Sequence, residues 1–221
     1  MKNKTIVLIL ICIIVAVLIL IGVYFFVKQN LAGGPENNGQ QNINNGLEGQ
    51  NTSNQTNLTD SNNQTTKNKL ATDDFEITLS DGWKGVPATA GISAMAIDTN
   101  ESITDPDAQK INFKTYLAVS YDTLKGKNMT EYMQLIKTAL LQTMPDTVFS
   151  NENILTINNR QASALEAEMT NQGVNFKVLM VVVKGNGDDI WIMSFNSLKN
   201  SWQQYAQTFS DIANSFVLKQ K

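Results

Sequence analysis

The carboxylates of one short polar stretch are the first groups in this chain that could do chemistry. Asp98, Glu101, Asp105 and Asp107 fall within a single segment, 98–107. Oxygen ligands on a flexible loop suit Ca²⁺. Their spacing matches no EF-hand loop, however, and the central glycine of such a loop is absent. A solvated acidic loop is therefore the better interpretation, and we expect no bound metal or other cofactor.

Glu166 and Glu168 form a second candidate pair, because alternate residues of a strand point to the same face. Two neighbouring carboxylates could do acid–base work if they were buried. The opposite face of the same strand would carry Leu165, Ala167 and Met169, which are apolar. We therefore expect the two glutamates to lie on the solvent side of the strand.

Other polar and aromatic residues near turns admit two interpretations. Arg160, the single arginine, could clamp an anion bidentately, but it follows a turn and is expected to be solvated. Asp188 and Asp189 are explained by a turn. Trp83 could be an exposed anchor for a partner or a packing residue, and packing is the favoured interpretation.

Several residue types that catalysis commonly needs are missing. The chain has no histidine and one cysteine, Cys12, so it lacks a zinc-type ligand set and every Ser-His or Cys-His pair. No phosphate-binding glycine loop or Gly-x-Ser-x-Gly elbow occurs. We expect the protein not to be an enzyme, and we assign no catalytic, cofactor-binding or metal-binding residue.

The N-terminal segment 1–28 is predicted to be an uncleaved signal-anchor helix. No charged residue lies between Lys4 and Lys28, and residues 6–27 would span about 33 Å, roughly the hydrocarbon core of a lipid bilayer. The apolar run is longer than that of a cleaved signal peptide. Bulky residues precede Cys12, which disfavours a lipoprotein signal.

The distribution of positive charge predicts the orientation of this helix. Lys2 and Lys4 precede the apolar run, and only Lys28 closely follows it. By the positive-inside rule the N-terminus is expected in the cytoplasm and the C-terminal domain outside, in the cell membrane as a single-pass protein.

Residues 29–68 are predicted to be a disordered linker. They contain twelve Asn, six Gln and five Gly with few aliphatic side chains, too little apolar surface to offset chain entropy. The Asn-x-Ser/Thr triplets at Asn51, Asn54, Asn57 and Asn63 are glycan acceptors or chance products of this composition.

Residues 69–221 are predicted to be one globular domain that begins with strands. Alternation predicts strands at 75–80, 91–97 and 115–121, and the polar stretch 102–110 is predicted to be a loop. An apolar stripe with helical spacing then predicts a helix from Asn128, its N-cap, to Met144.

The second half of the domain is predicted to contain four strands and a closing helix. The strands are expected at 147–157, 162–169, 174–183 and 190–195, the last two in the centre of the sheet because both of their faces are apolar. The closing helix, with Asn200 or Ser201 as its cap, carries an apolar stripe: Trp202, Tyr205, Phe209, Ile212 and Phe216. These aromatic residues could line a ligand groove, but their period favours core packing. The expected fold class is α+β, a three-layer α/β/α domain with a central antiparallel sheet.

The order of these parts resembles the PsbP-like domain family over roughly residues 72–219. The resemblance rests on short structural motifs: Gly82-Trp83, Met129-Thr130-Glu131-Tyr132, Ile157-Asn158-Asn159-Arg160-Gln161-Ala162, Trp191-Ile192-Met193-Ser194-Phe195 and Ile212-Ala213-Asn214-Ser215-Phe216. It implies an antiparallel sheet between helices and non-catalytic work, such as binding a protein partner or assisting a membrane complex.

Two functions follow as hypotheses. The first is a membrane-tethered, extracytoplasmic interaction or accessory module with a membrane or envelope protein as partner. The alternative is an extracytoplasmic protein that binds a small molecule or Ca²⁺. Nucleic acid is disfavoured as a partner, because residues 69–221 carry 17 Asp and Glu against 12 Lys and 1 Arg.

Overall fold

A computed structural model describes residues 68–219. The predicted signal-anchor helix at 1–28 and, apart from Asn68, the predicted linker at 29–68 lie outside the described residues. Within the part of the chain that the structure describes, no helix is both long enough and apolar enough to cross a membrane.

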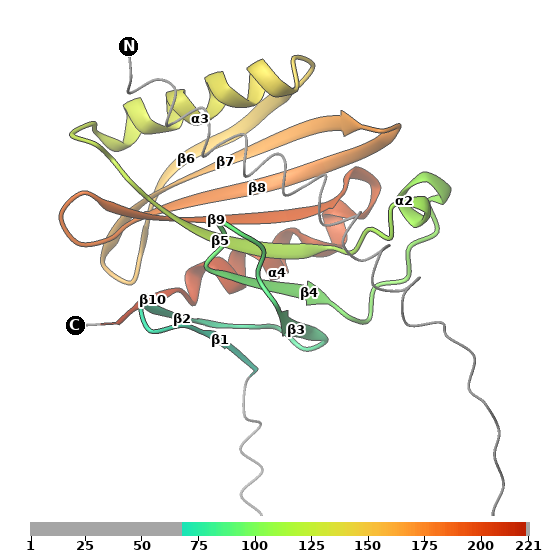
Figure 1. Ribbon diagram of the computed structural model, residues 1–221, viewed down its shortest axis with the longest axis horizontal. Helices are drawn as coiled ribbons and strands as arrows, with labels where there is room; N and C mark the ends of the chain where they lie inside the picture. The colour runs from blue at the N-terminus through green and yellow to red at the C-terminus, as the bar shows by residue number, and fades with distance from the viewer. Residues whose placement is uncertain (1–67, 220–221) are drawn as a thin grey trace, which may run out of the picture.

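A seven-stranded antiparallel sheet forms the body of the domain (Figure 1). Its strands are β3 (Trp83–Val86), β4 (Ala94–Asp98), β5 (Tyr116–Thr123), β6 (Val148–Ile157), β7 (Arg160–Asn171), β8 (Val174–Lys184) and β9 (Asp189–Leu198). Their order across the sheet is β3-β4-β5-β9-β8-β7-β6, and every neighbouring pair is antiparallel. The predicted antiparallel sheet is therefore confirmed.

The turns and the apolar runs explain this order. Asn158 and Asn159 both have positive φ, 46° and 63°, as a tight two-residue hairpin turn between β6 and β7 requires. Strands β8 and β9 lie between β5 and β7, which confirms their predicted central position. Val182 and Val183, on opposite faces of β8, are both fully buried.

Two helices cover opposite faces of the sheet (Figure 1). The helix α3 (Met129–Thr143) shares a core with one face of β7, β8 and β9, where Leu165, Val182 and Ile192 are buried. The helix α4 (Trp202–Asn214) packs on the other face. Asn128 caps α3 as predicted: its side chain accepts a hydrogen bond from the backbone N–H of Glu131, and its own backbone N–H donates to the Glu131 carboxylate.

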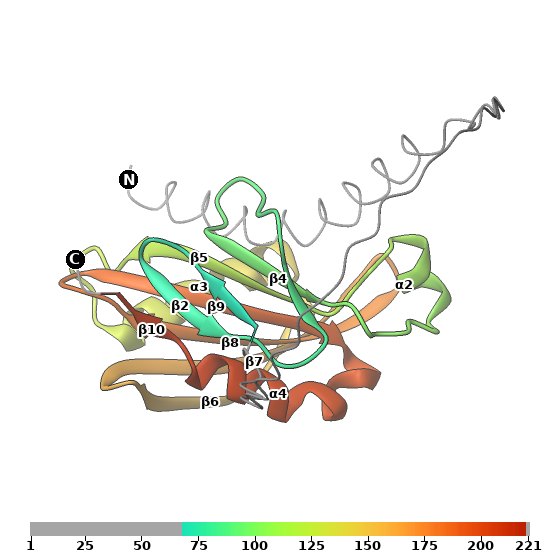
Figure 2. The same cartoon turned by 90° about the horizontal axis from the view of Figure 1, so that it is seen from below.

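A second, three-stranded sheet lies on the α4 side of the main sheet. It consists of β1 (Lys69–Ala71), β2 (Phe75–Thr78) and β10 (Val217–Leu218) in the order β1-β2-β10. Phe75 and Ile77 of β2 are fully buried in the same core as Phe209 of α4. Figure 2 shows β2 and β10 lying across the main sheet near α4.

Aromatic rings fill the space between the main sheet and α4. Phe209 lies 5.5 Å from Tyr205, 5.7 Å from Trp202 and 6.0 Å from Trp83, measured between ring centroids. Trp83 is only 3% exposed, so it is a packing residue and not a surface anchor. The predicted core role of the α4 aromatic stripe is confirmed by the burial of these rings.

Two local predictions were wrong. The stretch 102–110 is not entirely a loop, because Pro106–Lys110 form the short helix α2. Asp105 accepts hydrogen bonds from the backbone N–H groups of Asp107 and Ala108, and proline is well suited to the first turn of a helix. Ser201 precedes α4 but makes no capping hydrogen bond, because the 3₁₀ turn Lys199–Ser201 leads directly into the helix.

A buried tyrosine ties each large helix to a carboxylate of the sheet. Tyr132 of α3 donates a 2.7 Å hydrogen bond to Asp122 of β5, and Tyr205 of α4 donates one of the same length to Asp98 of β4. Asp122 and Asp98 are 6% and 8% exposed. Burial, together with the neighbouring carboxylate, raises the pKa of both phenols, so each remains a donor across the physiological pH range.

We predict that Tyr132→Phe and Tyr205→Phe each lower the free energy of unfolding by about 1–3 kcal/mol, because each leaves a buried carboxylate with one donor fewer. Urea denaturation followed by circular dichroism measures the loss. Tyr121→Phe is the matched control: its phenol also donates a 2.7 Å hydrogen bond to an aspartate, Asp189, but Tyr121 is 44% exposed. Equal losses in all three variants would contradict the importance of burial.

Candidate functional site

The structure separates the four acidic residues that the sequence placed in one loop. Asp98 ends β4 and binds Tyr205, and Asp105 caps α2. Asp107 pairs with Lys110 at 2.7 Å. Among the described residues, no group of three or more His, Cys, Asp or Glu side chains is arranged to hold a metal ion. The carboxylates of segment 98–107 therefore stabilise local structure.

Glu101 is the member of this group with the least ordinary surroundings. Its carboxylate accepts hydrogen bonds from the backbone N–H and the hydroxyl of Thr115, at 2.5 and 2.8 Å. Burial raises the pKa of Glu101 and the nearby Asp98 raises it further, while Thr115 and Lys114 oppose the shift. The side chain fastens the loop after β4 to the start of β5.

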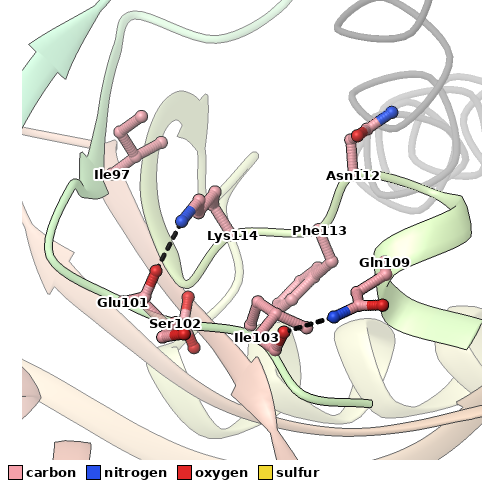
Figure 3. Close-up of a pocket in the computed structure, with 8 residues that line it drawn as sticks. All are labelled: Ile97, Glu101, Ser102, Ile103, Gln109, Asn112, Phe113 and Lys114. Carbon is pink, nitrogen blue, oxygen red and sulfur yellow. Dashed lines mark hydrogen bonds between the residues drawn. The ribbon is translucent and has the colours of Figure 1, made fainter. Parts of the chain in front are cut away.

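A groove of about 500 Å³ opens beside this attachment, between the loop after β4, helix α2 and the segment that enters β5 (Figure 3). We call it the α2 groove. It is lined by Ile97, Glu101, Ser102, Ile103, Gln109, Asn112, Phe113 and Lys114. Three apolar and five polar side chains thus share one concave surface.

Two hydrogen bonds fix the shape of the α2 groove (Figure 3). Lys114 donates from Nζ to the backbone carbonyl of Glu101, and Gln109 donates from its amide to the carbonyl of Ile103 at 2.7 Å. The ring of Phe113 packs against the ring of Phe176, with centroids 5.1 Å apart. The walls are therefore preformed, which lowers the entropic cost of binding.

Some polar groups of the α2 groove have no partner within the described residues. The amide of Asn112 and the hydroxyl of Ser102 make no hydrogen bond there. Lys114 forms no ion pair with a carboxylate in the same part of the chain. The amide and the hydroxyl can donate hydrogen bonds to a ligand in the groove and accept them from it, and the Lys114 ammonium can donate.

Glu166 and Glu168 lie together, but not on an open solvent face. Lys177 of β8 approaches both, at 2.9 and 3.3 Å, and Lys199 approaches Glu168 at 2.6 Å. The Nζ of Lys177 also lies 4.8 Å from the ring centre of Trp202. This cluster fastens the start of α4 to β7 and β8.

Arg160 and the aspartates of the β8–β9 turn are also occupied. Arg160 donates to the carbonyl of Gly185 at 2.9 Å and to the side chain of Asn186 at 3.3 Å, so it braces the turn and is not simply solvated. Asp188 accepts from the backbone N–H of Gly126 at 3.0 Å, and Asp189 accepts from Tyr121.

The sequence did not single out most residues of the α2 groove. Glu101 was named for its charge, but Phe113, Lys114 and Gln109 carry no local signal of a site. The proline after Asp105 was the available sign that a helix begins there. Ala108 of that helix is buried with Val174 of β8 and Leu198 of β9.

No protein-family model and no curated protein matches the sequence. Among solved structures, similar folds occur in LpqN, involved in cell envelope biogenesis of Mycobacterium tuberculosis (TM-score 0.49, 14% identity, covering 66% of this chain and 83% of that one), and in cyanobacterial PsbP from Synechocystis sp. PCC 6803 (TM-score 0.47, 18% identity, 66% and 86%). A Pseudomonas aeruginosa protein of unknown function is also similar (TM-score 0.44, 10% identity, 66% and 92%). Cyanobacterial PsbP is thus among these neighbours, and at these identities the likeness concerns the fold alone.

We predict opposite pH dependences for Glu101→Gln and Glu168→Gln. The pKa of Glu101 is raised in the folded protein, so the stability that its carboxyl contributes is present in acid and is lost as the pH rises through that pKa. Glu101→Gln has no titrating group at this position, so its stability does not fall in this way. The pKa of Glu168 is lowered, chiefly by Lys199, so its contribution is complete above an unfolded pKa of about 4.3 and disappears in acid.

Urea midpoints measured from about pH 3 to pH 8 test this pair of predictions. Relative to the unaltered protein, Glu101→Gln should gain stability as pH rises. Glu168→Gln should be less stable by about 0.5–1 kcal/mol at neutral pH and should show no difference in strong acid. Parallel pH profiles for the two variants would contradict the assignment.

Proposed function

We propose that this chain is a membrane-tethered, extracytoplasmic, non-catalytic module that holds a segment of an envelope or membrane protein in the α2 groove. The observation that supports this best is the composition of the groove: an apolar surface from Ile97, Ile103 and Phe113 beside an amide and a hydroxyl that have no partner within residues 68–219. A peptide segment presents the complementary set, with apolar side chains and a backbone that both donates and accepts hydrogen bonds.

The distribution of the carboxylates supports binding over catalysis. The acidic residues that the sequence suggested for Ca²⁺ binding or acid–base chemistry are engaged in caps, ion pairs and hydrogen bonds with phenols or backbone. A catalytic carboxylate would need to face a substrate. Only Glu101 borders the groove, and its carboxylate accepts from Thr115.

The N-terminal sequence supports the tether. Residues 6–27 have the length and polarity of a bilayer-spanning helix, and the polar segment 29–68 would let the domain search the nearby membrane surface. A tether of this kind raises the effective concentration of the domain near partners in the same membrane, so a shallow groove can suffice for binding.

A small-molecule ligand is the second candidate function. The volume of the α2 groove, about 500 Å³, falls within the range of small-molecule pockets, about 300–1,000 Å³. Calcium is the less favoured ligand of this class, because Asp98, Asp105 and Asp107 are directed to separate partners.

Site-specific photo-crosslinking of the full chain in its own membranes tests the partner hypothesis. A photoreactive amino acid at Ser102, an exposed residue of the groove, should give one discrete crosslinked product, identified by mass spectrometry. The same amino acid at Ile154 is the control, since Ile154 is 77% exposed on β6 and far from the groove. Equal products from both positions would contradict the proposal.

We further predict that Lys114→Glu and Ile103→Asp reduce the Ser102 crosslink at least about tenfold, because a charge reversal or a buried charge at an interface costs about 2 kcal/mol or more. Ile154→Asp should leave the yield unchanged. Thermal denaturation of each variant shows whether the loss reflects binding or unfolding. A yield insensitive to both groove variants, in a folded protein, would favour the small-molecule function.

A further inference from the structure

A second cavity, of about 410 Å³, lies toward the end of β5 that is opposite to the α2 groove. Its walls come from the β8–β9 turn, from β5 and β9, and from the residues that flank β2 and β10. We call it the Tyr121 cavity. The residues that matter for its chemistry are Asp74, Ser93, Tyr121, Asn186, Asp189, Trp191 and Lys219.

Two aromatic rings form one wall of the Tyr121 cavity. Tyr121 and Trp191 pack edge to face, with centroids 5.3 Å apart and planes inclined at 60°. Trp191 is 5% exposed and packs against Phe75, with ring centroids 5.0 Å apart. Tyr121, in contrast, is 44% exposed. The hydroxyl of Tyr121 donates a 2.7 Å hydrogen bond to Asp189, so the exposed ring is fixed in place.

The polar groups around this wall combine acceptors and donors of both charges. The carboxylates of Asp74 and Asp189 are acceptors, and the ammonium of Lys219 and the hydroxyl of Ser93 are donors. Lys219 is held by the backbone carbonyl of Thr72. The pKa of the Tyr121 phenol is raised, first by Asp189, so the phenol stays protonated at neutral pH.

We infer that the Tyr121 cavity binds a saccharide. Sugar hydroxyls donate and accept hydrogen bonds at once, which matches a mixed set of carboxylate, amide, hydroxyl and ammonium groups. The C–H face of a pyranose carries partial positive charge and is attracted to the electron-rich face of an aromatic ring such as Tyr121.

Other ligand classes fit these walls less well. A simple cation would meet the ammonium of Lys219, and a simple anion would meet the carboxylates of Asp74 and Asp189. An apolar molecule would desolvate all three charges without compensation. A neutral polyhydroxyl compound avoids each of these costs.

Saturation-transfer NMR on the full chain tests the inference, in a detergent without a sugar headgroup so that the micelle offers no competing ligand. The probes are glucose, galactose, mannose and N-acetylglucosamine at about 10 mM, each as the monosaccharide and as a short oligosaccharide. Choline and acetate are the cation and anion probes. We expect saturable binding of at least one saccharide, with the strongest transfer to ring C–H protons.

Variants locate the binding. Tyr121→Ala should weaken saccharide binding about five- to tenfold, because it removes the exposed ring, and Tyr121→Phe should keep most of it. Leu141→Ala is the control, since Leu141 is similarly exposed, at 42%, on α3. Equal affinity for a monosaccharide and an oligosaccharide would assign the site to free sugars. Higher affinity for the oligosaccharide would assign it to the end of a glycan chain.

The inference is overturned if no saccharide gives saturable transfer to the folded protein, or if Tyr121→Ala and Leu141→Ala bind equally well. Binding of choline or acetate in place of every saccharide, lost in Tyr121→Ala, would overturn it as well. Because the Tyr121 cavity and the α2 groove share no lining residue, Lys114→Glu should leave saccharide binding intact, and the two proposals can fail separately.

Discussion

Two buried carboxylates on neighbouring strands determine where both large helices lie. Asp122 of β5 accepts a hydrogen bond from the phenol of Tyr132, and Asp98 of β4 accepts one from the phenol of Tyr205, so each face of the sheet is joined to its helix by a buried hydrogen bond between side chains. Buried polar groups of this kind permit few arrangements, because any other packing leaves a buried charge with one donor fewer. Asp98 also accepts from the backbone of Asn100, at the start of the loop that frames the α2 groove. The shape of the groove is thus linked to the seating of α4.

The periodicity of the sequence was sufficient to predict strands β4 to β9 of the main sheet and its two covering helices, because alternation and the 3.6-residue stripe depend on burial of whole faces. It predicted no strand at Trp83–Val86, the edge strand β3, and the strand predicted at 75–80 pairs in the small sheet as β2. It was not sufficient for features that join distant residues. The bond between Tyr205 and Asp98 spans 107 positions, and Asp98 was read as part of an acidic loop. Strands β1 and β10 have three and two residues, too few for a period to emerge. The α2 groove forms where the loop after β4, the helix α2 and the segment that enters β5 meet. None of these segments predicts a groove from its own sequence.

The acidic residues of this chain show how charge can be used for architecture. Asp105 begins a helix, Glu101 fastens a loop, and Glu166 with Glu168 surrounds Lys177 beside Trp202. Each of these carboxylates meets backbone N–H groups, a hydroxyl or an ammonium that would otherwise lose its solvation on folding. A cluster of acidic residues in a sequence therefore has to be weighed against the donors that the fold will bring to it.

The small sheet determines how mechanical load would enter the domain. Any tension on the chain before Asn68 reaches β1 first, and β1 is held to β2 by a ladder of three residue pairs. Its antiparallel partner β2 is in turn bonded to β10, so both ends of the described chain converge on one strand, apart from the seven-stranded sheet. A pull from the N-terminal side would load β1 and, through the hydrogen bond from the Asn68 side chain to the carbonyl of Trp83, the edge strand β3 before it strained β5 or β9. The short strand β1 would therefore yield while the α2 groove, which is lined by no residue of the small sheet, keeps its shape.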